Sequence, residues 1–215
     1  MTPADNILYF NDDIDIRICL KNGYTTLRTA WLSCHHMEYY TGRSESHVPI
    51  GAPARYELAM KYQDIWDQPF RRGSYRIAVK RDPIQRFIST VSYLNNVKLE
   101  PRYTEDKKPY IDLTNVNKDD IDSVLDAFDN QTLKDEHFFS QSYFMGQPND
   151  YDKVYDITEL PELLSWMTTK CKPKKPIEKL WENKTKDTSA RIELTDKQKM
   201  RVIKLYAKDY ANGWY

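Results

Sequence analysis

The stretch "ICLKNGYTTLRTAW", residues 18–31, begins with the apolar pattern of a buried strand and ends with the pattern of a helix. The turn between the two patterns carries one cation, one glycine and two hydroxyls. Gly23 lets the backbone approach a ligand closely, and the free N–H groups that open a helix favour a phosphate. The turn therefore predicts an anion site. Its residues are Lys21, Asn22, Gly23, Tyr24, Thr25 and Thr26.

An ordinary turn explains the same residues about as well, with Lys21 in solvent and the threonines as helix caps. The turn is not a Walker A loop, because GxxxxGK[ST] places its lysine after the glycines, whereas Lys21 precedes Gly23. The rest of the chain has to indicate which anion would bind here.

A second turn, "VKRDPIQRFISTVSYL" at 79–94, joins another strand pattern to another helix. Asp82 followed by proline is a favourable helix start, as an N-cap and a first-turn residue. Arg86 and Ser89 lie three residues apart, away from the apolar face of this helix, so both can project toward one ligand. Together with Arg81 they offer a phosphate two guanidinium groups and a hydroxyl. In the alternative interpretation Arg81 pairs with Asp82, and Arg86 is a solvated surface residue.

Strand patterns alternate with helical patterns along the chain, which indicates an α/β fold with a mostly parallel central sheet flanked by helices. The strands are expected at 16–20, 75–80 and 153–158. The helices are expected at 24–34, 54–66, 83–94, 119–128, 159–171 and from about 195 onward. Because no boundary is visible, residues 1–215 are expected to form a single domain. In such folds ligands bind at the carboxyl ends of the strands, where both polar turns lie.

Composition narrows the class of protein. The 215 residues include 32 basic and 32 acidic side chains, so no overall positive field favours nucleic acid or an anionic membrane as a partner. The N-terminus is acidic where a signal peptide is basic, and no segment has the roughly 20 apolar residues of a transmembrane helix. Cys19, Cys34 and Cys171 lack CxxC and zinc spacing, which indicates buried or free thiols in a reducing compartment. We therefore expect a soluble cytoplasmic protein, or a catalytic domain without its anchor.

Taken together, "KNGYTT" at 21–26 and "RDPIQRFIS" at 81–89 resemble two elements of the sulfotransferases that use 3′-phosphoadenosine-5′-phosphosulfate (PAPS), closest to the carbohydrate branch typified by Golgi enzymes. The first is similar to K-x-[GA]-[SC]-[ST]-[ST], except that Tyr24 replaces a small residue. The second matches every fixed position of R-D-P-x-x-R-x-x-S. Weaker similarities follow in the family's order, in "DEHFFSQSYF" (135–144), "YDITEL" (155–160), "NKT" (183–185) and "LYAKDYANGWY" (205–215).

The resemblance implies a P-loop-like three-layer fold and transfer of a sulfuryl group from PAPS to a hydroxyl, with a carbohydrate as the expected acceptor. Residues 21–26 would cradle the 5′-phosphosulfate, with Lys21 beside the leaving oxygen. The residues that would bind the 3′-phosphate and cover the nucleotide are Arg81, Arg86, Ser89, Lys184 and Thr185. A solvated charged loop explains the last two equally well. This chemistry requires no metal.

A base must also take the proton of the acceptor hydroxyl, and the sequence leaves this residue open. His47, in "SHVPIG" at 46–51, resembles the T-H-x-P segment that supplies the base in many sulfotransferases, so it is favoured. His137 comes next and a carboxylate last. The resemblance implies, however, that the histidine and the glutamine of "EHFFSQ" shape the site rather than act as the base. A structural role remains the alternative for each histidine.

Two other functions fit the same turns. One is a kinase-like nucleotide-dependent enzyme, against which the missing Walker A spacing counts. The other is a non-catalytic protein that binds a nucleotide or a glycan, against which the intact Lys21, Arg81 and Ser89 count. Preference for ATP over PAPS would support the first. Binding of adenosine 3′,5′-bisphosphate (PAP) without turnover would support the second.

Overall fold

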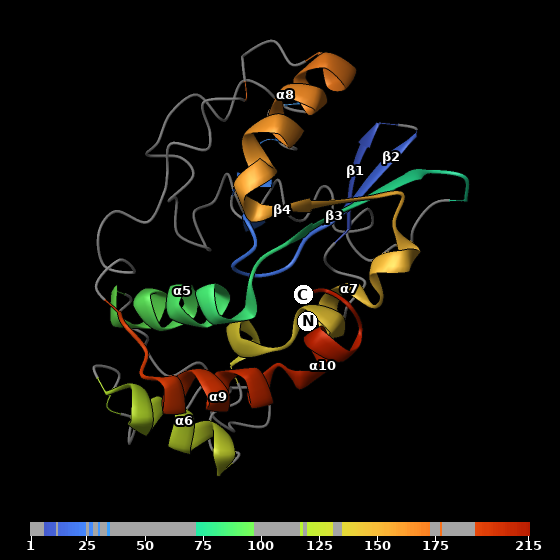
Figure 1. Ribbon diagram of the computed structural model, residues 1–215. Helices are drawn as coiled ribbons and strands as arrows, with labels where there is room; N and C mark the ends of the chain where they lie inside the picture. The colour runs from blue at the N-terminus through green and yellow to red at the C-terminus, as the bar shows by residue number, and fades with distance from the viewer. Residues whose placement is uncertain are drawn as a thin grey trace, which may run out of the picture. The chain divides into compact units, whose positions relative to one another are not determined.

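The computed structural model describes residues 7–11, 13–24, 26, 27, 30, 34, 72–96, 117, 120–130, 135–172, 177 and 192–215 (Figure 1). The chain divides into two compact units, each made of two stretches. The first unit comprises Met1–Lys80 and Tyr143–Lys184, and the second comprises Arg81–Ser142 and Thr185–Tyr215. The turns at 21–26 and 81–89 therefore belong to different units, and the single domain expected for the chain stays a prediction.

The first unit is built on a four-stranded sheet in the order β1-β2-β3-β4. The strands are β1 (Ile7–Asn11), β2 (Ile14–Arg17), β3 (Tyr75–Lys80) and β4 (Lys153–Asp156). β3 runs parallel to both β2 and β4, whereas β1 is antiparallel to β2. The parallel strands and the helices that accompany them confirm the predicted α/β class with a mostly parallel sheet.

The core of the first unit lies between the sheet and α8 (Leu160–Cys171), which confirms the helix predicted at 159–171. α8 presents apolar side chains at the i, i+3, i+4, i+7 spacing of a helix that buries one face. Its fully buried residues are Leu160, Leu163, Leu164 and Met167. They share one cluster with Ile16, Ile77 and Val79 of the sheet and with Leu27 and Ala30, which follow the first turn.

The strand predicted at 16–20 is misplaced, because burial and strand geometry do not coincide there. β2 occupies Ile14–Arg17. Ile18, Cys19 and Leu20 are buried, with at most 7% of their surface exposed, but they lie beyond the end of the strand. The apolar residues 16–20 therefore predict burial correctly, whereas residues 18–20 lie between the strand and the turn.

The strand predicted at 153–158 ends two residues early. The carboxylate of Asp156 accepts the backbone N–H of Thr158 at 3.0 Å, which starts the short 3-10 helix η4 (Ile157–Glu159). Aspartate side chains compete in this way with a continuing strand. By contrast, the strand predicted at 75–80 coincides with β3.

The first unit also brings two thiols together. Cys34 and Cys171 are partly buried free cysteines beside the apolar core, and Cys19 is fully buried. The hydrogen bond between Cys34 and Cys171, assisted by burial, raises the pKa of Cys34. The same hydrogen bond lowers the pKa of Cys171. The prediction that the cysteines are buried or free thiols is therefore confirmed.

The second unit is helical. Its elements are α5 (Pro83–Asn96), α6 (Ile121–Asp129), the 3-10 helix η2 (Glu136–Phe138), the start of α7 (Gln141–Met145), α9 (Asp196–Leu205) and α10 (Ala207–Ala211). α9 packs against both α5 and α6. The apolar face predicted for α5 forms much of the core, with Phe87, Val91 and Leu94 fully buried. The helices predicted at 83–94, at 119–128 and from about 195 are therefore confirmed.

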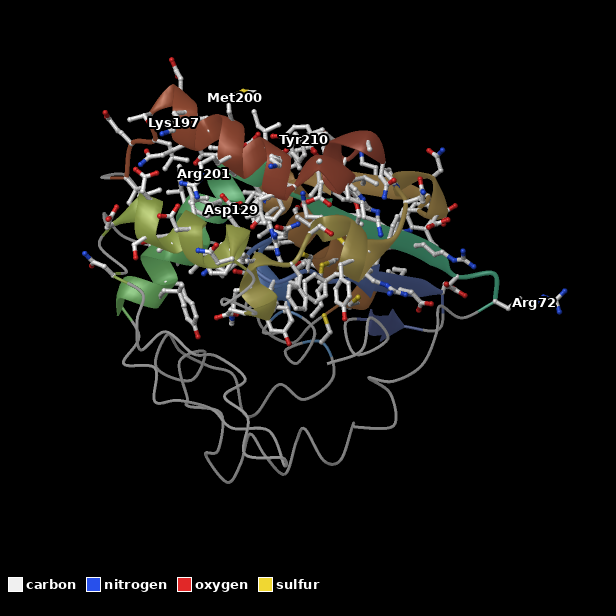
Figure 2. All side chains as sticks on the ribbon, turned by 90° about the horizontal axis from the view of Figure 1, so that it is seen from below. Arg72, Asp129, Lys197, Met200, Arg201 and Tyr210 are labelled. Atoms are coloured by element: carbon white, nitrogen blue, oxygen red, sulfur yellow. The ribbon has the colours of Figure 1, made fainter. Side chains whose placement is uncertain are left out.

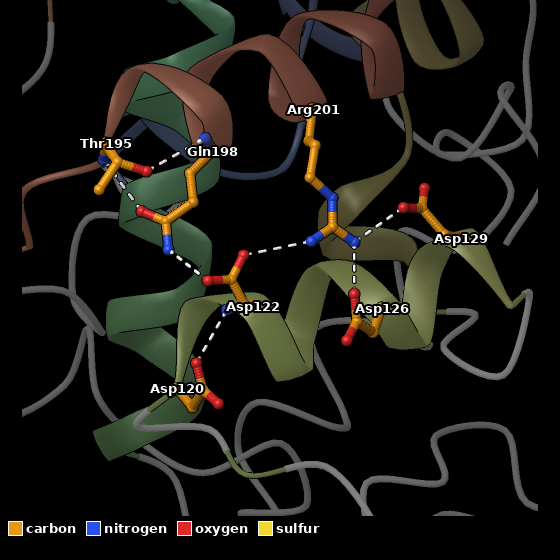
Figure 3. Close-up of polar contacts among 7 residues, drawn as sticks. All are labelled: Asp120, Asp122, Asp126, Asp129, Thr195, Gln198 and Arg201. Carbon is orange, nitrogen blue, oxygen red and sulfur yellow. Dashed lines mark hydrogen bonds and ion pairs between the residues drawn. The ribbon is translucent and has the colours of Figure 1, made fainter.

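Arg201 of α9 joins three aspartates on α6 (Figure 3). Its Nη1 atom lies 3.2 Å from Asp122 Oδ1, and its Nη2 atom lies 2.6 Å from Asp126 Oδ1 and 2.7 Å from Asp129 Oδ2. The hydrogen bonds to Asp126 and then Asp129 raise the pKa of Arg201. One cation thus neutralises part of an acidic face that α6 would otherwise present by itself.

Arg201→Ala is expected to lower the free energy of unfolding by about 1 kcal/mol, because ion pairs between exposed groups are individually weak. The difference from the wild type should shrink at high salt, which screens exposed charges. Urea denaturation at low and high ionic strength measures both. Lys197→Ala is the control, since Lys197 lies on the same helix and has no ion pair among the described residues (Figure 2). An equal loss in the two variants would contradict this role of Arg201.

Candidate functional site

The first turn leaves the sheet where β2 and β3 run parallel, and its backbone is tightly folded. Lys21 and Gly23 both have a positive φ, at 69° and 78°. The helix opens at once, because the N–H of Leu27 donates to the carbonyl of Gly23 at 2.9 Å. The N–H groups that open a helix generally have no carbonyl partner within it. The turn thus places a lysine before a helix opening, and the anion site itself stays a prediction.

Asn22 fixes this turn from the inside. Its side chain is fully buried, and Nδ2 donates to the backbone carbonyl of Val79 at 2.8 Å. Val79 is the penultimate residue of β3. The sequence interpretation placed Asn22 among the ligand contacts, whereas the structure shows its side chain tying the turn to the carboxyl end of the neighbouring strand.

The structure also describes three other polar or aromatic residues of the turn, Lys21, Tyr24 and Thr26. Lys21 and Thr26 are half-buried, and Tyr24 packs against the apolar core of the first unit. Tyr24 differs from the small residue of the sulfotransferase motif. Its large side chain is accommodated because it packs against this core. Thr25 lies outside the described residues.

Gly23 is required by its surroundings as well as by its φ. A Cβ atom at this position would lie 2.9 Å from Cδ2 of Leu160 and 3.3 Å from Cδ1 of Ile157. Leu160 is fully buried, so it has little room to move aside. The glycine thus lets the turn lie directly against the start of α8.

Gly23→Ala is expected to lower the free energy of unfolding by about 2 kcal/mol, from left-handed strain and the clash with Leu160 together. It should also weaken PAP binding, because the turn must move. Gly73→Ala is a matched control, since Gly73 has the same φ of 78° and nothing within 4 Å of an added Cβ. Urea denaturation and calorimetry of both variants give the comparison. If Gly73→Ala were as harmful as Gly23→Ala, the close packing at Gly23 would have no special role.

The second turn begins α5 as predicted. Asp82 Oδ1 accepts the N–H of Gln85 at 2.8 Å, and its carbonyl accepts the N–H of Arg86, also at 2.8 Å. Pro83 is the first residue of the helix, a position that needs no N–H donor. Asp82 therefore serves as the N-cap.

The backbone of Arg81 is clamped by one glutamine. The N–H of Arg81 donates to Gln141 Oε1 at 2.8 Å, and Gln141 Nε2 donates back to the carbonyl of Arg81 at 2.9 Å. Gln141 is fully buried, and so is Asp209, whose carboxylate accepts the N–H groups of Gln141 at 2.9 Å and Ser142 at 2.7 Å. Asp209 therefore holds the start of α7, and α7 holds the backbone from which the Arg81 side chain extends.

Arg86 and Ser89 require a correction. The sequence interpretation put them on an open side of the helix, or left Arg86 solvated, yet only 0% and 3% of their surfaces are exposed. Arg86 Nη2 donates to the carbonyl of His137 at 3.2 Å, and the guanidinium lies 5.6 Å from the ring centroid of Tyr206. Arg86 thus supports η2 from within the unit, and it is not a solvated surface residue.

Of the two histidines considered as the base, His137 falls among the described residues and His47 does not. Its Nδ1 lies 2.7 Å from Oδ1 of the fully buried Asp135. The same oxygen accepts the backbone N–H of His137 at 2.8 Å. The other predicted site residues, His47, Lys184 and Thr185, lie outside the described residues.

Sequence reasoning missed Asp135 and Asp209 as parts of this arrangement. Asp135 stands two residues before His137, a spacing at which an aspartate caps a short helix and can reach the ring. Asp209 belongs to the "YAKDY" pattern within 205–215, which had been noted without a role. In both cases the residue was visible in the sequence, but the burial of its carboxylate was not.

No protein-family model matches the chain, and no curated protein or solved structure matches it significantly. Within the described stretches, no helix has the length and apolar character to cross a membrane. The same residues contain no group of three or more histidine, cysteine, aspartate or glutamate side chains arranged to hold a metal ion. The resemblance to sulfotransferases accordingly depends on the sequence motifs alone.

Proposed function

We propose that this protein is a PAPS-dependent sulfotransferase with a P-loop-like fold, and that it transfers a sulfuryl group to a hydroxyl of a carbohydrate. The observation that carries the proposal is the first turn. A lysine and a glycine, both at positive φ, lead into a helix at the carboxyl end of parallel strands. Asn22 holds that turn against β3. A lysine that precedes the opening of a helix is an arrangement that suits a phosphate.

Each residue has a distinct part in the proposed reaction. PAPS supplies the sulfuryl group and leaves as PAP. Lys21 counters the negative charge that develops on the departing phosphate oxygen, and Thr25 and Thr26 contribute hydroxyl donors. Arg81 provides a guanidinium for the 3′-phosphate, from a backbone that Gln141 fixes at both its N–H and its carbonyl. Positioning and electrostatics supply the catalysis, as in phosphoryl transfer.

Transfer of labelled sulfuryl from PAPS to a panel of mono- and oligosaccharides tests this proposal, with ATP as the competing donor. Label recovered on a sugar hydroxyl is the expected result. Transfer of phosphate from ATP in preference would support the kinase-like alternative. Binding of PAP without transfer to any acceptor would support the non-catalytic alternative.

A further inference from the structure

The Asp135–His137 pair allows one step beyond the proposed function. We infer that Asp135 is a positioning residue that keeps the proton of neutral His137 on Nδ1, so that Nε2 is free to act as the general base. The inference rests on the proposed function and selects His137 from the bases that the sequence left open.

The hydrogen bonds of Asp135 determine which ring nitrogen carries the proton. Oδ1 accepts the backbone N–H of His137 at 2.8 Å and lies 2.7 Å from Nδ1 of the same residue. Because Oδ1 already acts as an acceptor, it meets Nδ1 as an acceptor too. Oδ2 is buried and has no hydrogen-bond partner among the described residues. A buried carboxylate is costly without donors, so its environment favours the tautomer that donates from Nδ1.

Residues of α5 hold the histidine from the other side. The carbonyl of His137 accepts from Arg86 Nη2 and from Thr90 Oγ1, each at 3.2 Å. The ring of Tyr93 lies 4.8 Å from the imidazole, between centroids. The charged or titratable residues that contact His137 include Asp135, Arg86 and Tyr93. Both the main chain and the ring plane are fixed.

Nε2 is the end of this ring that can meet a substrate. The His137 side chain is 19% exposed, and no described residue bonds to Nε2. In the reaction, Nε2 takes the proton of the acceptor hydroxyl while the hydroxyl oxygen forms its bond to sulfur. The bond from sulfur to the phosphate oxygen breaks, and that oxygen keeps the electron pair. The carboxylate of Asp135 then stabilises the imidazolium.

Asp135→Ser separates the two tasks of this aspartate. A serine oxygen can still cap η2, but it removes the carboxylate from the ring. Long-range proton–nitrogen correlation spectra of the full chain with labelled histidine, with His137→Gln identifying the signal, show which ring nitrogen is protonated. In the wild type the proton is expected on Nδ1. In Asp135→Ser it should move to Nε2, the preference of free imidazole, and kcat should fall by about 10²-fold or more at unchanged PAP affinity.

Asp120→Ser is the matched control, because Asp120 caps α6 through the N–H of Asp122 and touches no histidine among the described residues. It should change neither the spectrum of His137 nor kcat. If Asp135→Ser does not fold, Asp135→Asn keeps the side-chain shape, and its lost charge should lower kcat in the same way.

The inference is overturned by a wild-type proton on Nε2, by an unchanged tautomer in Asp135→Ser, or by full kcat despite a changed tautomer. Failure of the proposed function would look different, as a wild type that neither binds PAP nor transfers sulfuryl. The spectra would still decide whether Asp135 orients His137.

Discussion

Lys21→Ala is expected to lower kcat for sulfuryl transfer by about 10²–10³-fold, the usual cost of losing one donor that stabilises a developing oxyanion. Lys21 precedes the helix opening and is half-buried, so its charge acts in a medium less polar than bulk water. Initial rates with labelled PAPS, at saturating acceptor, measure the effect. The KM for PAPS should rise less than kcat falls, since the charge on the leaving oxygen develops in the transition state.

Lys172→Ala is the matched control for Lys21→Ala. Lys172 is the other described lysine at positive φ, at 46°, and it caps the end of α8 in the same unit. Its replacement removes the same charge and the same side chain from a left-handed position, and the rate of transfer should stay that of the wild type. Equal rates in the two variants would remove Lys21 from the mechanism.

Asp209→Ala is expected to lower the free energy of unfolding by about 3 kcal/mol or more, because two hydrogen bonds to a buried carboxylate are lost. The N–H groups of Gln141 and Ser142 would then be left without their acceptors. Asp209→Asn should be nearly as harmful in spite of its shape, since its NH₂ group would face an N–H donor. Urea denaturation of the full-length protein, followed by a signal from the second unit, measures the free energy of unfolding of both variants.

Asp120→Ala serves as the comparison for Asp209→Ala. Asp120 also accepts a backbone N–H at a helix start, but it is exposed, and such caps contribute about 1 kcal/mol. A loss for Asp209→Ala no larger than that for Asp120→Ala would show that the buried carboxylate has no special role. Reduced PAP affinity in Asp209→Asn at temperatures where it remains folded would link the carboxylate to Arg81 through Gln141.

Local signals in the sequence were sufficient where a single short motif determines the structure. Asp82 and Pro83 predicted the start of α5, and the strand pattern "YRIAVK" at 75–80 predicted β3. α9 follows the N-cap Thr195, whose hydroxyl accepts the N–H of Gln198 while the Gln198 side chain accepts the N–H of Thr195. Such reciprocal capping involves residues only three apart, so it is visible in the sequence.

Features that depend on distant partners could not be predicted. The burial of Arg86 is one example, because two of its partners, His137 of η2 and Tyr206, lie about 50 and 120 positions away along the chain. By contrast, the antiparallel strand β1 was missed although its sequence ILYFN is rich in residues that strands favour and its partner β2 follows closely in the chain. The first turn was located correctly, yet the role of Asn22 appeared only with its bond to Val79.

Calorimetric titration with PAP tests the central claim most directly, with ADP and 5′-AMP as ligands that lack the 3′-phosphate. Arg81→Ala is the decisive variant, because both bonds between Arg81 and Gln141 use backbone atoms of Arg81 and remain after the substitution. We expect PAP to bind the wild type in the micromolar range and to lose that affinity either without its 3′-phosphate or without the Arg81 side chain. Equal binding of PAP and 5′-AMP would contradict the assignment of PAPS as the donor and leave the first turn as an anion site for another ligand.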